Sequence, residues 1–175
     1  DASFPALQRA IEQSRVVTFT YLRPGEARPR ERRIRPLALL EYEARWHVFG
    51  FDLNMDADRT FLLSRIVGDV TVTRAGFPAE LREGAGERAL AGLRRVADRQ
   101  RALLEVHPGT EAALRLARRA EAAPQGIVVP YVDLHVFADE LASYGPEVRV
   151  VGPDDLRAEV VRRLEATLHL HGGAA

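Results

Sequence analysis

Residues 31–52, ERRIRPLALLEYEARWHVFGFD, contain the pattern that decides the fold. Two runs within it, 31–41 and 45–52, are rich in leucine, β-branched and aromatic residues, and the residues Glu41–Ala44 connect them. Apolar runs of this length separated by a connection of hairpin length predict an antiparallel pair of strands.

More strands are predicted on both sides of this pair. Before it, Val17, Phe19 and Tyr21 share one face of a run of β-branched and aromatic residues. After it, residues 53–58 and 67–68 are short polar or glycine-containing connections. Five short strands within about 60 residues predict a small, strongly bent sheet or barrel, because so few residues cannot bury two separate sheets. The expected elements are a helix over 4–13 and strands over 15–22, 31–41, 45–52, 59–66 and 69–74.

The composition changes after Gly76, and the remainder predicts a small α/β module. Residues 78–100 are rich in Ala, Arg and Glu, which predicts a linker followed by a helix. Asp133 is an expected N-cap. Beyond the linker we expect strands over 102–107, 126–132 and 147–151, and helices over 110–122, over 134–143 and after Asp154. The predicted organisation is a first domain over 1–76, a linker with a helix over 77–100 and a second domain over 101–172.

The charge of the chain is zero only as a sum. It has 175 residues, with 25 basic and 25 acidic side chains, and every basic one is arginine. Residues 1–74 carry a net charge of +2, whereas residues 126–175 carry −4. The absence of cysteine excludes disulfides and thiolate zinc sites and indicates a cytoplasmic protein, and no apolar run reaches the roughly 18 residues of a membrane span.

Catalytic patterns are missing from the sequence. There is no glycine-rich phosphate loop, GxSxG or HExxH motif. His169 and His171 are two residues apart, a spacing that does not place both on one face of a helix. Asp154 and Asp155 stand at a helix start, where the helix dipole accounts for them. We therefore predict a protein that is not an enzyme and has no cofactor and no metal.

Arginines on the predicted strands suggest a binding surface. Because alternate side chains of a strand share a face, Arg33 and Arg35 lie opposite Ile34, and Arg59 and Arg65 are expected on one face of the fourth strand. The only tryptophan lies beside His47. Arginines near aromatic rings hold phosphates and stack on bases. A solvated basic surface with the tryptophan in the core explains the same pattern equally well.

Four elements in order resemble the WYL domain of bacterial transcription regulators. They are Thr18–Tyr21, Arg33–Leu39, Arg45–Asp52 and Asp58–Ile66. The Trp-Tyr-Leu triplet that names the family reads Trp46-His47-Val48 here, and Leu62 and Ser64 stand where the last element usually has arginine and aspartate.

The rest of the chain resembles the C-terminal extension of such proteins, the WCX domain. Residues 141–157, LASYGPEVRVVGPDDLR, match its closing motif. This extension implies a ferredoxin-like βαββαβ order, although residues 121–133 look short for its central hairpin. The whole is most similar to the proteasome-accessory-factor B/C type.

The resemblance implies an α+β protein: a small Sm/SH3-like β-barrel followed by a ferredoxin-like α/β module. It also implies a ligand-sensing part of a dimeric regulator, homo- or heterodimeric and with no membrane partner. The ligand is single-stranded DNA or RNA, or a nucleotide, and promoter DNA is bound through an N-terminal helix-turn-helix that residues 1–14 are too few to form. The implied ligand-binding residues are Tyr21, Arg33, Arg35, Trp46, His47, Arg59 and Arg65. Among them Arg35, Arg59 and Arg65 bind phosphate, Tyr21 or His47 contacts a base, and Trp46 packs the barrel.

Two other interpretations stay open. The chain is an interaction module with a degenerate pocket, which dimerises through the apolar side of its last helix, or it senses a small phosphorylated metabolite. The apolar residues in question are Leu156, Val160, Leu164 and Leu168.

Overall fold

The computed structural model describes residues 1–172 and divides the chain into two compact units, Asp1–Gly92 and the part from Leu93 onward. Helix α2 (Ala85–Arg99) begins in the first unit and ends in the second. No helix in the described part of the chain is long and apolar enough to cross a membrane.

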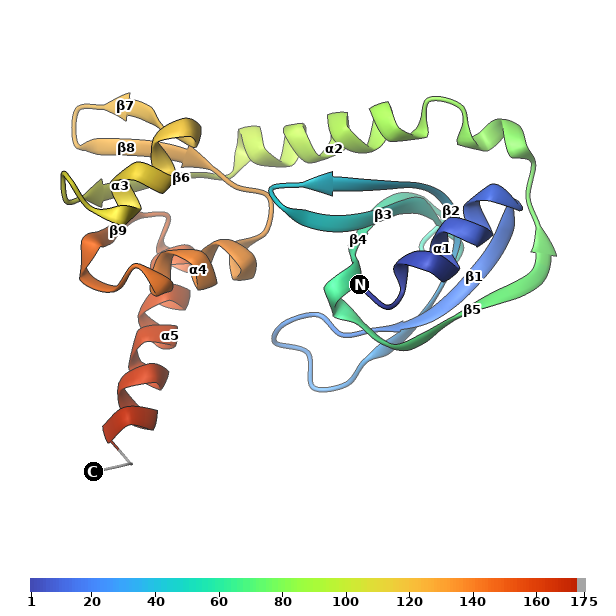
Figure 1. The fold of residues 1–175 in the computed structure, drawn as a ribbon, viewed down its shortest axis with the longest axis horizontal. Coiled ribbons are helices and arrows are strands. Elements are labelled where there is room, and N and C mark those ends of the chain that lie inside the picture. The colour runs from blue at the N-terminus through green and yellow to red at the C-terminus, as the bar shows by residue number, and fades with distance from the viewer. Residues whose placement is uncertain (173–175) are drawn as a thin grey trace. The chain divides into compact units, whose positions relative to one another are not determined.

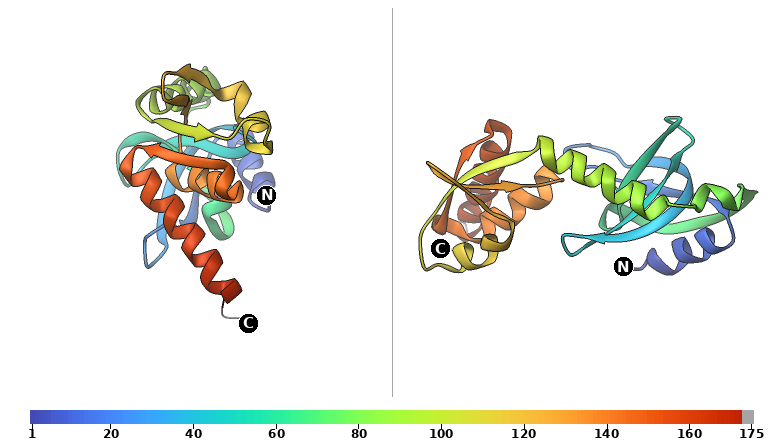
Figure 2. Two further views of the ribbon diagram at one scale, coloured as in Figure 1. Left: turned by 90° about the vertical axis from the view of Figure 1, so that its left-hand side faces the viewer. Right: turned by 90° about the horizontal axis from the view of Figure 1, so that it is seen from above.

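The first unit is one antiparallel sheet with strand order β4-β3-β2-β1-β5. Figure 2 shows its strands crossing at steep angles, as in the strongly bent sheet that the sequence predicts. The elements are α1 (Phe4–Glu12), β1 (Arg15–Tyr21), β2 (Arg30–Tyr42), β3 (Arg45–Asp52), β4 (Ala57–Leu62) and β5 (Ile66–Gly76).

The predicted strand over 59–66 is wrong at its end. β4 stops at Leu62, Leu63–Arg65 form a 3-10 turn, and the predicted connection Val67-Gly68 lies inside β5. The reason is the strand order. β4 and β5 are the two outer strands of the sheet, so the chain cannot run on from one into the other and instead changes direction at Leu63–Arg65. Arg65 is on this turn and does not share a strand face with Arg59.

The two faces of this sheet carry separate apolar clusters, which we call the inner face and the outer face. The inner face is covered by α1 (Figure 1), whose Leu7 and Ala10 belong to one core cluster with Val17, Phe19 and Phe61. On the outer face Val16, Leu37 and Phe49 pack with Phe77 and with Ala85 and Ala89 of α2. Both faces are therefore partly closed, and side chains of alternate residues enter different environments.

The second unit has the βαββαβ order that the resemblance implies, with strand order β7-β8-β6-β9. Its elements are β6 (Arg101–Val106), α3 (Glu111–Leu116), β7 (Glu121–Ala123), β8 (Gly126–Pro130), α4 (Leu134–Ser143), β9 (Val148–Gly152) and α5 (Asp154–Gly172). Helices α4 and α5 lie on one side of the sheet (Figure 1). The expected cap is confirmed, because Asp133 Oδ1 accepts a hydrogen bond from Val136 N at 3.0 Å.

The central hairpin of the second unit, for which residues 121–133 looked too short, is formed by β7 and β8. The predicted helix over 110–122 ends at Leu116, and a short 3-10 turn leads into β7. Only Pro124 and Gln125 then separate β7 from β8. Gly126 permits this tight turn, since its φ is +149°. A Cβ atom there would also lie 2.1 Å from Leu104 O on the neighbouring strand β6.

The long helix α5 is buried only over its first half. Leu156 and Val160 belong to the core of the second unit, and Leu164 packs against that core. Leu168 is 71% exposed. The predicted apolar side of this helix therefore mostly packs on its own unit. The side chain of His171 lies outside the described residues, so the histidine pair is not tested.

A hydrogen-bonded group joins the 3-10 turn after α3 (Ala117–Arg119) to α4 beside this core. Arg119 Nη1 donates to both carboxylate oxygens of Glu140, at 3.0 and 2.9 Å, and its guanidinium lies over the Phe137 ring. Tyr144 Oη donates to Glu140 Oε2 at 2.8 Å. Burial of the phenol, followed by its hydrogen bond to the Glu140 carboxylate, raises the pKa of Tyr144 to about 12.

We expect this tyrosine to make the second unit sensitive to alkali. The unfolded side chain has a pKa near 10 and the folded one near 12, so the folded state retains the proton longer. The free energy of unfolding therefore falls as the pH rises through this interval. Denaturant titrations between pH 10 and 12 should show a smaller fall in the free energy of unfolding for Tyr144→Phe than for wild type. Equal slopes in the two proteins would contradict the assignment.

Candidate WYL ligand surface

The seven predicted ligand residues do not gather on one surface. Strand register places Tyr21, Trp46 and Arg59 on the inner face. Arg33, Arg35 and His47 point to the outer face. Arg65 follows β4 on the 3-10 turn and is partly buried. A small ligand cannot contact all seven at once.

Tyr21 is part of the inner-face core and is 4% exposed. Its ring meets Phe61 edge-on at a centroid distance of 5.1 Å. Its oxygen accepts a hydrogen bond from Leu62 N at 3.0 Å, which ties the end of β1 to the end of β4. The environment is that of a structural tyrosine with its polar atom already paired.

Arg59 lies at a more open part of the inner face. Its side chain is 23% exposed, its guanidinium carbon is 5.4 Å from the centre of the Phe61 ring, and Nη1 is 3.5 Å from Asp52 Oδ2. Asp52 is fully buried, and its other oxygen accepts hydrogen bonds from Asn54 N and Met55 N. The Asp52 carboxylate thus stabilises the β3–β4 turn through its hydrogen bonds and also orients the Arg59 side chain.

Trp46 packs edge-on against Phe4 of α1, with ring centroids 4.8 Å apart. It is partly buried at the border of the inner-face cluster. Its indole therefore already has an aromatic partner within the first unit.

The outer face presents a second guanidinium over a ring. The Arg35 guanidinium carbon lies 5.4 Å from the centre of the Phe51 ring, and the two residues are directly paired across β2 and β3. Arg33, two residues earlier on the same face, is exposed. Arginine in this geometry keeps its N–H donors available for an oxyanion.

Comparison with known protein families identifies both units. The WYL domain family matches residues 2–72, and the WCX domain family matches residues 98–168. The chain carries a WYL domain followed by a WCX domain.

Known relatives agree with this pair of domains. Protein PafB of Mycobacterium tuberculosis is 30% identical over 170 residues, which cover 91% of this chain and 51% of PafB. Protein PafB of Mycobacterium leprae is 29% identical over the same length. The solved structure of proteasome accessory factor B/C (PafBC) of Arthrobacter aurescens matches with a TM-score of 0.55 and 30% identity, covering 94% of this chain and 27% of that one. The chain thus spans about half the length of the curated relatives it matches.

Two departures of this WYL domain from the family pattern are neighbours in space. His47 replaces the usual tyrosine and Leu62 the usual arginine, and these residues are directly paired across β3 and β4. Both are 5% exposed, and His47 Nδ1 lies 3.0 Å from Arg45 O. This part of the outer face is therefore buried, and at position 62 it has an apolar side chain in place of the family's arginine.

One arginine of the WYL domain escaped the sequence prediction. Arg32 lies on the inner face, paired with Phe19, and is only 7% exposed. Its alternation with Arg33 was visible in the sequence. Which of the two residues is buried could not be read from the sequence, because that depends on which face of the sheet carries the inner cluster.

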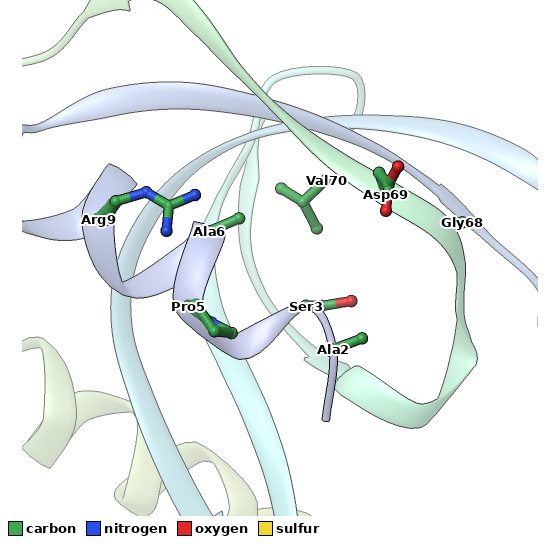
Figure 3. A pocket seen from close by; sticks show the side chains of 8 residues that line it. All are labelled: Ala2, Ser3, Pro5, Ala6, Arg9, Gly68, Asp69 and Val70. Atoms are coloured by element: carbon green, nitrogen blue, oxygen red, sulfur yellow. The ribbon is translucent and has the colours of Figure 1, made fainter.

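A shallow pocket of about 370 Å³ lies between the start of α1 and β5 of the WYL domain (Figure 3). Its lining includes Ser3, Arg9 and Asp69, and none of the seven predicted residues. Across residues 1–172 no three His, Cys, Asp or Glu side chains are grouped so as to hold a metal ion.

Proposed function

We propose that this chain is the ligand-sensing and interaction part of a PafB/C-type transcription regulator. Its WYL domain would bind single-stranded nucleic acid or a nucleotide, and binding would control a helix-turn-helix elsewhere in the intact protein. The WYL and WCX matches and the similarity to PafB and PafBC support this proposal.

The observation that carries the proposal is the pair of guanidinium groups held over aromatic rings. Arg35 over Phe51 and Arg59 over Phe61 are both partly exposed. A ring beneath the guanidinium fixes its plane and excludes water from one side, which favours a phosphate on the other. Arg65, partly exposed on the 3-10 turn, is the third phosphate contact that we propose.

The placement of these residues favours a flexible strand over a single nucleotide. Arg35 and Arg59 are on opposite faces of the same sheet. One nucleotide would reach only one of them, whereas an oligonucleotide that crosses the β4 edge would reach both. β4 is an outer strand of the sheet, so no strand is hydrogen-bonded to its far side.

Titration of labelled single-stranded oligonucleotides tests this function. With about three phosphate contacts the affinity should fall as roughly the second power of salt, on the order of tenfold for a fourfold increase. Arg35→Ala and Arg59→Ala should each weaken binding and lower the salt exponent by about 0.7. Arg74→Ala, an exposed arginine on β5, is the control.

The outcomes separate the alternatives. Binding that does not respond to salt, or no binding at micromolar protein, rejects the nucleic-acid function. If mononucleotides raise the melting temperature and oligonucleotides do not, the ligand is a nucleotide or another small phosphorylated metabolite and not a nucleic-acid strand. If only one arginine variant affects an oligonucleotide, the path across the β4 edge is wrong.

A second candidate function, dimerisation through the WCX domain, is favoured by the exposed end of α5. Leu168 and Leu170 are 71% and 76% exposed there, although Leu156 and Val160 are buried in the domain itself. Light scattering without ligand tests it. A dimer that dissociates in Leu168→Glu would support an interaction role, and a monomer at all concentrations would reject it.

A further inference from the structure

The inner face of the WYL domain buries a cation that has no counterion. Arg32 is 7% exposed, and its Nε atom is inaccessible to solvent and has no hydrogen-bond partner. It is paired with Phe19 across β1 and β2, and it lies two residues before the fully buried Ile34 on the same face. Within residues 1–172 no ion pair involves its guanidinium.

Such a burial is unfavourable on its own. Arginine remains protonated in proteins, so it cannot escape the cost of burial by losing its charge. An ion taken out of water without a partner destabilises the folded state. The remaining 7% of exposure shows that part of the residue still reaches solvent.

Two acidic side chains of this unit have buried oxygens, and neither is an ion-pair partner of Arg32 in the described residues. Asp52 is the other fully charged residue buried in this unit, and its two oxygens face Asn54 N, Met55 N and Arg59 Nη1. Glu26, on the loop between β1 and β2, has a buried Oε2 atom that also lacks a partner. No ion pair joins Glu26 to an arginine in the described residues.

We propose that Arg32 binds a small oxyanion of the phosphate type on the inner face. The guanidinium fork matches two phosphate oxygens. The Phe19 and Phe61 rings, 5.4 Å apart at their centroids, provide the apolar surroundings in which such a contact is strengthened. This inference does not rest on oligonucleotide binding, because Arg32 is not one of the three phosphate contacts proposed above.

Thermal unfolding of the whole chain in phosphate and in chloride, at matched ionic strength, tests the proposal. Phosphate should raise the melting temperature of wild type, by roughly 4 °C at ten times its Kd. Arg32→Met should show no response to phosphate. In chloride alone this variant should melt no lower than wild type, because the uncompensated charge is removed and the apolar stem is retained. Arg74→Met, which alters an exposed arginine on β5, should respond to phosphate as wild type does.

Three results would overturn the assignment. A lower melting temperature of Arg32→Met in chloride, without any phosphate response in wild type, would make Arg32 a structural residue. A phosphate response that appears only in Glu26→Gln would show that Glu26 neutralises Arg32 in solution. A response to acetate as large as that to phosphate would reject the phosphate class. None of these results depends on whether an oligonucleotide binds.

Discussion

Gly50→Ala is expected to destabilise the WYL domain by about 3 kcal/mol or more. Gly50 lies on β3, where β2 passes so closely that a Cβ atom would be 2.5 Å from the carbonyl oxygen of Arg35 and 3.1 Å from Ile34 Cδ1. The first of these atoms belongs to the backbone, so no side-chain rotation relieves the clash. The strands would have to separate at the point where the β2–β3 register already shifts, between Pro36 and Ala38.

Tryptophan fluorescence during denaturant unfolding measures this effect, because Trp46 is the only tryptophan and lies in the WYL domain. Gly76→Ala is the matched control. It also adds a methyl group on a strand of the same sheet, but its nearest contact is Ser14 O at 3.5 Å. A midpoint for Gly50→Ala equal to that of the control would show that β2 and β3 do not approach this closely.

Leu104→Ala is expected to destabilise the WCX domain by about 2–5 kcal/mol. Leu104 is fully buried on β6, which pairs with both β8 and β9, and it contributes to the single core cluster of this unit. Truncation leaves a cavity that the flanking strands prevent from collapsing.

Amide hydrogen exchange of β6 and β8 gives the measurement, since the WCX domain contains no tryptophan. Leu114→Ala is the control, because Leu114 is 77% exposed on α3 of the same domain. Exchange in Leu104→Ala that is no faster than in this control would mean that β6 is not the centre of the core.

Local patterns predicted most of the individual elements. The run 45–52 became β3 with the same bounds, and Asp133 caps α4 as expected. The end of β4 could not be predicted in this way. Residues 63–65 have the composition of the strand before them, and their 3-10 turn follows from the need to carry the chain between the two outer strands of the sheet.

The candidate site was less predictable than the fold. Alternation along one strand correctly placed Arg33 beside Arg35 on one face, but the face of one strand relative to another depends on register. The shift between Pro36 and Ala38 is not visible in the sequence, and it contributes to separating Arg35 from Arg59. The burial of Arg32 likewise depends on which face of β2 carries the inner cluster, to which α1 contributes Leu7 and Ala10, and no short stretch of sequence contains that information.

The edges of the WCX sheet have a consequence for solubility. β7 at one edge is only three residues long, and β9 at the other carries Arg149, which is bound to Glu105 on the neighbouring strand by a bidentate ion pair. A short edge and a charged edge are both poor templates for added strands. Edge-to-edge pairing of this sheet with the sheets of other copies is therefore disfavoured even when many copies of the protein are crowded together.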